Sequence, residues 1–549
     1  MTKYLNSNKL RGGYYTPLDV AEWLTKWAVQ SGSDQILEPS CGDGVFLSAA
    51  AKMLRKYRKT NGGHVHGIEI SEVEASKARH RVCEAPSVTV KVADFFEWAK
   101  DNTGTHFDAV VGNPPFIRYQ NFPEPSRSIA MALMESLGLR PNKLTNIWVP
   151  FVAITTSMLR DGGRLAMVLP AELLQVSYAA QLRSYLVDHF RQVKIMACNE
   201  MIFAEAEQEV VLVLADGRIA DPSSQHTCRI DLDESKTVSQ LLATVPAAGG
   251  NGRAKSVRHD SEKWLKYFLT PREISFMRRL RADGVAEPLS TVAEVDVGVV
   301  TGKNSFFVLS PSQADMYAVR ANTVPLLGRS SQMRGAVIDT TELSALEAED
   351  NKVLLFYVPD DSNGDLSAAA KAYIAFGEKE GVNKGYKCRI RKKWYSVPSV
   401  WEPDCFVFRQ IYDFPRVVAN KTHATSTDTI HRMRCSTNAD LLTRNLYTHL
   451  TGASAEIEGR SYGGGVLELE PTEAERVLVP GQLTEDALGL AEIDEMIRAG
   501  RLEDALVMND ERVLIRGMGL SQGDCSMLMR IWKKMRNRRM SRKKSSRRS

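Results

Sequence analysis

The sequence predicts an α/β protein in which a mostly parallel sheet, with helices on both faces, is followed by a mixed α+β half. Three observations support this fold class. Short apolar segments, typical of buried strands, alternate with helical runs in the first third of the chain. Acids, glycines and an asparagine follow these strands directly, where an open parallel sheet holds its ligands. Cations interleaved with aromatic residues mark the second half, and 549 residues suffice for two or three domains.

The first strand leads into a glycine-rich turn. Residues 35–37 form a short, mainly apolar strand candidate, and Glu38-Pro39-Ser40-Cys41-Gly42-Asp43-Gly44 follows as a tight turn before a helical run over residues 45–57. Glycines let the backbone approach a ligand closely, and the start of the helix supplies oriented N–H donors. The turn therefore indicates a ligand-binding loop, although such a turn is not specific to one ligand.

Three further strands are each followed by candidate site residues. These segments are 65–70, which ends in Glu69 and Ile70, 88–92, which leads to Asp94 and Phe95, and 107–112, which leads to Asn113. A carboxylate placed like Glu69 accepts hydrogen bonds from ribose hydroxyls in nucleotide-binding folds, whereas the alternative is an ordinary charge at a strand end. Because parallel strands end at one edge of a sheet, we expect these polar residues and Glu38 to surround a nucleoside-bearing cofactor.

The stretch Asn113-Pro114-Pro115-Phe116 suits the methylation of a planar amino group. An exocyclic amine on a purine is a poor nucleophile, because its lone pair is delocalised into the ring. Acceptors at the Asn113 side-chain oxygen and the Pro114 carbonyl can draw this lone pair out of conjugation. The two prolines stiffen the backbone that aims the acceptors, and the Phe116 ring offers a face on which a base can stack. A proline-rich loop after a buried strand is the alternative interpretation.

These motifs, in this order, resemble a gamma-class (Taq-type) DNA adenine-N6 methyltransferase of a restriction–modification system. The matching segments are Gly13-Tyr14-Tyr15-Thr16-Pro17, residues 38–46, Glu69, Asp94-Phe95 and residues 113–116, with weaker matches at 161–170 and at 201–206 before a strand at 210–214. The resemblance implies a Rossmann-like catalytic domain that uses S-adenosyl-L-methionine. It also implies a second base-stacking aromatic at Phe203, for which core packing is the alternative. Many relatives carry tyrosine where this chain has Phe116.

The reaction and the roles around the cofactor follow from the resemblance. A methyl group would pass from S-adenosyl-L-methionine to the N6 amine of a flipped-out adenine in double-stranded DNA, which protects the DNA from a separately encoded cognate restriction endonuclease. The implied positions are Tyr15 and Thr16 near the methionine moiety, Glu38, Cys41 and Gly42 around the cofactor backbone, Glu69 on the ribose, Asp94 and Phe95 at the adenine, with Gly44, Ile70 and Asn113 also in the cofactor site. No metal is required by this chemistry.

The second half of the chain is predicted to recognise DNA. We expect a catalytic domain at 1–245, a linker at 246–262, a target-recognition domain at 263–455, and a largely helical extension with a basic tail at 456–549. Within the second half of the chain, helices are expected at 273–281, 485–499 and 521–535, a strand at 416–419, and a hairpin with a glycine-containing turn at 295–309.

Candidate DNA contacts combine cations with flat rings, which suit phosphates and base edges. They are Lys387, Arg389, Arg391, Lys392, Trp394, Lys421 and His423. A solvated charge run is the alternative for the segment around 384–395. His423 and His431 are interpreted as hydrogen-bonding side chains rather than metal ligands.

The net charge of +5 is unevenly placed. Residues 530–549 carry eleven Lys and Arg residues and no acid, so the rest of the chain carries about −6. Such a tail either binds phosphate backbones without reading sequence or is a solubilising, frayed end.

Composition favours a folded protein, and the lack of a membrane span and of a signal peptide predicts a cytoplasmic location, with no metal site expected. Because the resemblance implies both a catalytic and a recognition half, the enzyme is expected to act on DNA as a monomer. The eight cysteines are scattered and are interpreted as reduced thiols. Two alternatives remain: an RNA or protein-glutamine methyltransferase that uses the same Asn-Pro-Pro-aromatic chemistry, and a catalytically inert DNA-binding specificity protein. Methyl transfer to DNA distinguishes them.

Overall fold

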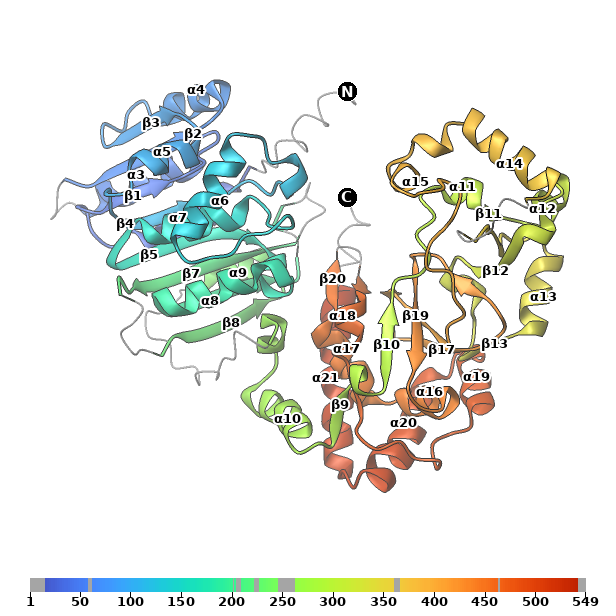
Figure 1. Cartoon of the computed structure of the whole chain (residues 1–549). Helices are drawn as coiled ribbons and strands as arrows, with labels where there is room; N and C mark the ends of the chain where they lie inside the picture. Colours follow the sequence, from blue (N-terminus) through green and yellow to red (C-terminus); the bar gives the residue numbers. More distant parts are fainter. Residues whose placement is uncertain are drawn as a thin grey trace. The chain divides into compact units, whose positions relative to one another are not determined.

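The backbone divides into two units, each of which is described by itself. The computed structural model describes residues 15–57, 62–200, 202–203, 209–221, 227–244, 262–359, 366–462 and 465–541. The first unit comprises residues 1–274 with 541–549, and the second unit comprises residues 275–540 (Figure 1).

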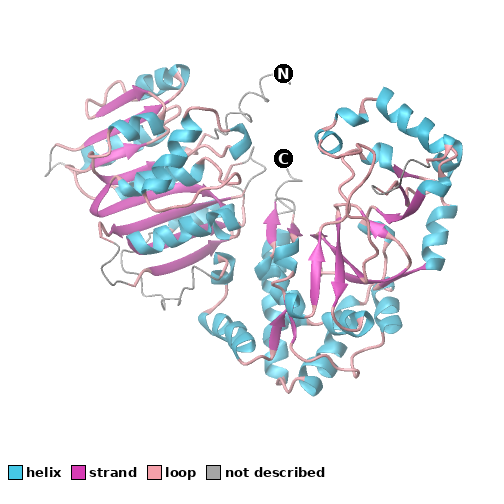
Figure 2. Ribbon diagram, viewed as in Figure 1, coloured by secondary structure: helices cyan, strands magenta, loops and turns pink. Residues whose placement is uncertain are grey.

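One sheet organises the first unit (Figure 2). Among the described residues, eight strands form it in the order β3-β2-β1-β4-β5-β7-β6-β8. They are β1 (Gln35–Glu38), β2 (His64–Glu69), β3 (Val88–Val92), β4 (Phe107–Gly112), β5 (Leu159–Pro170), β6 (Phe190–Cys198), β7 (Val210–Arg218) and β8 (Arg229–Ser235). Neighbouring strands are parallel, except that β7 runs antiparallel to β5 and β6. Strand order reverses at β1, which β2 and β4 flank, so a ligand site is expected beyond its carboxyl end.

Helices cover both faces of this sheet. They are α2 (Leu18–Ala28), α3 (Val45–Lys56), α4 (Glu72–Arg81), α5 (Phe95–Asp101), α6 (Ser126–Ser136), α7 (Trp148–Ser157), α8 (Ala180–His189) and α9 (Val238–Ala243). Helices α2, α3 and α9 share one buried cluster with alternate strand residues such as Val111, Val168 and Leu212. The residues between these point to the opposite face, where α7 and α8 contact β5 and β6. The predicted α/β fold class is confirmed.

The strands expected in the first third of the chain are present. Segments 88–92 and 107–112 coincide with β3 and β4, and the helical run after the glycine turn is α3. Strand β1 includes Glu38, whereas β2 ends at Glu69, one residue earlier than expected. These elements are predictable because apolar strands bounded by glycine and proline are local signals.

The second unit contains several smaller sheets. Its five-stranded sheet has the order β10 (Ala293–Asp296), β19 (Ile430–Cys435), β15 (Cys405–Phe408), β17 (Val417–Lys421) and β13 (Val337–Asp339). A second sheet has the order β11 (Val308–Leu309), β14 (Leu354–Phe356), β12 (Thr323–Leu327) and β18 (Thr425–Ser426). The remaining pairings join β16 (Gln410–Ile411), β21 (Val466–Glu468) and β20 (Arg460–Tyr462), and β22 (Leu478–Pro480) with β9 (Ala286–Pro288).

Helices connect these sheets. They are α10 (Pro271–Ala282), α11 (Asn304–Phe307), α12 (Pro311–Met316), α13 (Thr340–Ala348), α14 (Ala368–Lys379), α15 (Tyr386–Arg389), α16 (Ala439–Leu446), α17 (His449–Glu458), α18 (Pro471–Ala474), α19 (Leu490–Arg498), α20 (Leu502–Asn509) and α21 (Gln522–Ser541). The helices expected at 273–281, 485–499 and 521–535 correspond to α10, α19 and α21, and the strand at 416–419 to β17. The segment from 456 onward also contains β20, β21 and β22, so it is less purely helical than expected.

The hairpin expected at 295–309 is wrong. Strand β10 pairs with β19 and β11 pairs with β14, so the two segments belong to different sheets. Between them, Gly298 lies against the backbone of Thr427, where a Cβ would come within 1.9 Å of the carbonyl oxygen. The chain therefore turns away along Thr427 instead of folding back on itself.

The last helix is tied into the second unit by ion pairs. Lys533 pairs with Glu503 at 2.8 Å, and Arg539 pairs with Glu456 at 2.5 Å, with both side chains of the latter pair buried. The expected boundary between the target-recognition domain and the helical extension, at 455/456, lies inside helix α17, which carries Glu456. This boundary stays a prediction. Cations at the root of the basic tail are thus neutralised internally, and residues 542–549 lie outside the described residues. No helix in the described part of the chain is long and apolar enough to cross a membrane.

Candidate active site

The turn after β1 is held in place by Glu69 at the end of β2. The Gly42 N–H donates to Glu69 Oε2 at 2.9 Å, and the Ser71 N–H donates to Glu69 Oε1 at 2.9 Å. Gly42 has φ +51°, and a Cβ there would meet no atom within 4 Å. Gly44 has φ +83°, and a Cβ there would lie 2.9 Å from the Ala78 Cα. The turn is therefore a fixed loop with an open face at Gly42, where a ligand can approach the backbone.

Glu38 is a buried carboxyl group at the end of β1. Its side chain is 2% exposed, and Oε2 has no hydrogen-bond partner among the described residues. Burial raises the pKa of Glu38 well above its usual value, and the nearby carboxylates of Asp43 and Glu69 raise it further. A buried polar atom without a partner is uncommon in folded proteins and is costly, so this oxygen is suited to a ligand donor.

Asn113 follows β4 and lies beside the end of β1. Strands β1 and β4 pair in parallel, and the Gly112 position, with φ +155°, faces Glu38, whose Cγ would lie 3.6 Å from a Cβ there. The Asn113 Nδ2 donates to Thr16 Oγ1 at 3.2 Å, and its backbone carbonyl accepts from Ser40 Oγ at 3.5 Å. The end of β4 is thus joined to both the turn after β1 and the segment before α2.

The aromatic candidates differ in exposure. Phe116 is half-buried and packs against the same cluster in which Phe203 is 5% exposed. Phe95 is 4% exposed and stacks on Phe151, with ring centroids 4.9 Å apart and planes 15° apart. Its ring therefore belongs to the core.

Asp94 caps helix α5. Its Oδ1 accepts from the N–H groups of Phe96 at 2.8 Å and Glu97 at 3.1 Å, and its Oδ2 accepts from Ser126 Oγ at 2.6 Å. A carboxylate offers about four lone-pair positions, so a further donor can still be accepted. The sequence analysis did not predict this capping role, although Asp94 followed three residues later by Glu97 is a helix-start signal.

The other cofactor candidates lie around the same strand ends. Thr16 is buried, and exposed Tyr15 donates to Glu74 Oε2 at 3.0 Å. Cys41 is buried, and burial together with Glu38 and Glu69 raises the pKa of its thiol. Ile70 is 64% exposed. The structure also brings Ser40, Ser71 and Ser126 into the polar contacts, none of which was singled out as a site residue. Among the described residues, no group of three or more His, Cys, Asp or Glu side chains is placed to hold a metal ion.

The DNA-contact candidates of the second unit fall into two groups. Lys387, Arg389 and Lys392 are exposed, and no acid or hydrogen bond in the described part of the chain engages their side chains. Arg391 instead donates to the carbonyls of Val300 at 2.8 Å and Thr301 at 2.9 Å.

The remaining candidates have protein partners. Trp394 Nε1 donates to Glu378 Oε1 at 3.0 Å. Lys421 pairs with Asp440 at 2.7 Å, and His423 Nδ1 lies 3.0 Å from Glu402 Oε2. His431 is buried, and its Nε2 lies 2.7 Å from the Leu469 carbonyl.

Comparisons with known proteins cover both units. Residues 1–240 match the family described as N-6 DNA Methylase, and residues 261–514 match the C-terminal domain of Type II methyltransferase M.Eco57I. Type II methyltransferase M.AccI of Acinetobacter calcoaceticus is 24% identical over 489 residues, which is 85% of each chain. M.XamI of Xanthomonas campestris pv. amaranthicola is 21% identical over 488 residues, with the same coverage.

A more similar but shorter match is Type II methyltransferase M.TthHB8I of Thermus thermophilus, 30% identical over 188 residues, 33% of this chain and 39% of that one. Among solved structures, the Type IIL restriction-modification enzyme MmeI, in complex with DNA, has a TM-score of 0.53 at 11% identity and covers 94% of this chain and 75% of its own. This likeness concerns the fold. Residues 1–240 are thus similar to N-6 DNA methylases, residues 261–514 are similar to the C-terminal domain of a type II methyltransferase, and the homologues that cover most of the chain are named type II methyltransferases.

Proposed function

We propose that this protein is a gamma-class, site-specific DNA methyltransferase that transfers a methyl group from S-adenosyl-L-methionine to the N6 amine of an adenine in double-stranded DNA. The observation that carries the proposal is the position of Asn113-Pro114-Pro115-Phe116. This segment begins where β4 ends, beside the glycine turn after β1, at the point where the strand order reverses. The match of residues 1–240 to the N-6 DNA Methylase family supports the same chemistry.

The strand ends fit S-adenosyl-L-methionine. The unsatisfied Glu38 oxygen is an acceptor for an ammonium group, and the open face at Gly42 admits a ligand close to the backbone. Glu69 is held by two N–H donors at a position suited to ribose hydroxyls. When bound, this cofactor supplies a methyl group already activated by its sulfonium.

The chain's own residues then prepare the acceptor. The Asn113 oxygen and the Pro114 carbonyl accept the two amine hydrogens, which stabilises the positive charge that develops as the amine attacks. Phe116, together with Phe203 of the cluster against which it packs, offers ring surface to the base. Such stacking is worth about 1–3 kcal/mol per base and offsets part of the cost of extruding the adenine from the duplex.

We further propose that the second unit is the DNA-recognition half. Lys387, Arg389 and Lys392 supply unpaired positive charge for phosphates. Arg391 and Trp394 support that segment from within. The type II methyltransferase names of the homologues and the restriction-modification title of the MmeI structure fit a role in protecting DNA against a separately encoded endonuclease. We further propose that the enzyme acts as a monomer in the cytoplasm of a bacterium or archaeon.

The test is transfer of labelled methyl to duplex DNA by the wild type and by Asn113→Ala, followed by single-molecule sequencing of the product. Asn351→Ala, a substitution in the second unit, is the matched control. We expect methylated adenine at one recurring site with the wild type and the control. We expect a loss of at least about a hundredfold with Asn113→Ala, as for removal of one transition-state hydrogen bond. Undiminished turnover by Asn113→Ala would refute the assigned role, and label on RNA or protein alone would refute the substrate.

A further inference from the structure

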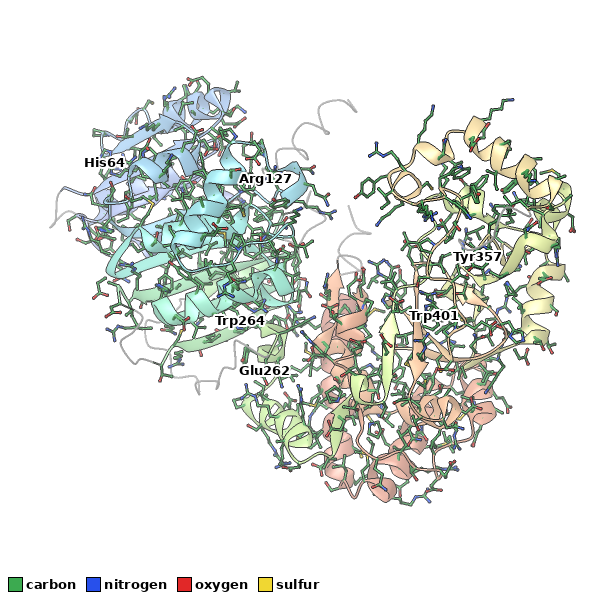
Figure 3. All side chains as sticks on the ribbon, viewed as in Figure 1. His64, Arg127, Glu262, Trp264, Tyr357 and Trp401 are labelled. Carbon is green, nitrogen blue, oxygen red and sulfur yellow. The ribbon has the colours of Figure 1, made fainter. Side chains whose placement is uncertain are left out.

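One end of the five-stranded sheet gathers side chains from separate segments of the second unit. Strand β19 pairs with β10 and β15, so Arg434 near its end lies opposite Glu294 and next to the segment before β15. That segment contains Trp401 and Glu402, and Glu402 meets His423, which follows β17, at 3.0 Å. Residues from three separate segments therefore lie on one surface, and the labelled Trp401 in Figure 3 shows where this surface is.

The half-buried Trp401 ring holds two guanidinium groups. Arg432 lies 4.3 Å and Arg434 lies 4.6 Å from the ring centroid. Arg432 is 1% exposed, and it donates to the carbonyls of Ser399 at 2.6 Å and Val297 at 2.8 Å. This arginine is therefore fixed, and it fixes the ring.

Arg434 differs from Arg432 in having no such bonds. It is exposed, and among the described residues no carboxylate and no hydrogen-bond acceptor engages its guanidinium. Stacking on an aromatic ring uses the flat face of a guanidinium and leaves its N–H edges available for a planar, two-point contact. The ring thus limits the orientations of Arg434 without consuming its donors.

The charges around Arg434 argue against a phosphate contact. Glu294 stands opposite it in the strand register, and Asp404 accepts from the Cys435 N–H at 2.8 Å. Carboxylates repel the DNA backbone, whereas a surface of mixed donors and acceptors matches the edges of bases. Guanine O6 and N7 form the pair of acceptors that an arginine fork fits best.

We propose that Arg434 reads a guanine in the DNA site by a two-point contact, with Trp401 as the positioning residue that holds its guanidinium flat. This inference rests on the proposed function, since it requires sequence-specific methylation of DNA. It goes beyond that function by naming a specificity-determining side chain and the base it recognises.

The experiment compares methylation of a randomised duplex library by the full-length wild type, Arg434→Gln, Trp401→Leu and Trp401→Phe, read by single-molecule sequencing. Arg389→Gln is the control for a cation without a ring partner. For Arg434→Gln we expect discrimination for guanine at one position of the site to fall by about tenfold or more, the size expected for a bidentate base contact, with the other positions still read. Trp401→Leu should weaken discrimination for guanine at the same position of the DNA site. Trp401→Phe keeps a flat ring and should retain most of that discrimination. Arg389→Gln should lower methylation of all sequences alike.

Three results would overturn the inference. The first is an unchanged site preference with Arg434→Gln. The second is a uniform loss at all sites, which would make Arg434 a phosphate contact or a structural residue. The third is relaxation of a position that is not guanine. In each of these outcomes the wild type still methylates its site, so the proposed function is not contradicted. A wild type that labels no DNA would contradict the proposed function as well.

Discussion

The strand-end site of the first unit and the surface of the second unit are built in opposite ways. In the first unit, polar groups are buried or half-buried and most are bonded to neighbouring groups, as Glu69 is to the turn at Gly42. In the second unit, cations such as Lys387 and Arg389 are exposed and lack acidic partners in the described part of the chain. The difference teaches that a reaction needs groups fixed before the substrate arrives, whereas attraction to a polyanion needs only charge that is free to approach it.

The largest effect is expected when the exposed positive charge in and just after α15, at residues 387–392, is removed. In the triple variant Lys387→Gln, Arg389→Gln and Lys392→Gln, affinity for DNA should fall by about a hundredfold or more at 0.1 M salt, because three fewer counterions are released. The slope of log affinity against log salt should become shallower by about 2.7, at 0.9 per contact. Filter binding or fluorescence anisotropy over a salt series measures both. An unchanged slope would mean that these side chains do not meet phosphates.

The buried carboxyl of the first unit should respond to pH rather than to salt. The folded-state pKa of Glu38 is raised, so its contribution to stability is fully present below the unfolded pKa and is lost as pH rises through the folded pKa. The cofactor's ammonium favours the ionised carboxylate, so binding should release a proton. In Glu38→Gln, cofactor affinity should fall by about 10- to 100-fold, as for loss of a charge-assisted hydrogen bond.

Calorimetry of cofactor binding in two buffers of different ionisation enthalpy detects this proton. The wild type should show release of a proton near neutral pH, and Glu38→Gln should show none from this group. Equal proton release by both would exclude Glu38 as the linked group, while the triple α15 variant should behave like the wild type.

Two arginines two residues apart sharpen the comparison inside the second unit. Arg391→Gln leaves the carbonyls of Val300 and Thr301 without their donor, so the free energy of unfolding should fall by about 2 kcal/mol. Arg389→Gln breaks no internal bond and should leave that free energy within about 0.5 kcal/mol. Denaturant titration followed by tryptophan fluorescence measures both. Equal stability losses would show that exposure and bonding do not separate the two residues.

The smallest effect is expected for a substitution that keeps the stacking ring at position 116. Phe116→Tyr keeps the ring and should change turnover by no more than about threefold, whereas Phe116→Leu removes a stack worth about 1–3 kcal/mol. Single-turnover methylation of duplex DNA, compared with DNA that carries a mismatch at the target adenine, gives the measurement. A mismatch that fails to reduce the deficit of Phe116→Leu would argue against a role in holding the extruded base.

The sequence predicts the first unit better than the second, for a physical reason. Strands β3 and β4 and the polar residues at their ends are read from apolar runs and breaker residues within a few positions. The pairing of β10 with β19 joins residues that are more than a hundred positions apart, so the local pattern favoured a hairpin that does not form.

Composition also cannot say which way a side chain points. Arg389 and Arg391 both lie in one cationic, aromatic segment, yet only Arg391 turns inward to backbone carbonyls. Asp94 is an intermediate case, because its capping of α5 could be read locally from Glu97 three residues later, while its bond to Ser126 could not.

The unequal bonding of Arg432 and Arg434 has a consequence for how this protein can change. Replacing Arg432 leaves the carbonyls of Ser399 and Val297 without its N–H donors, so variation at this position is disfavoured. The Arg434 side chain stacks on the same ring but makes no hydrogen bond or ion pair with the described residues, so substitutions there should leave the sheet intact. New DNA preferences can therefore be explored at that position, by evolution or by design, on a scaffold that its neighbour keeps folded.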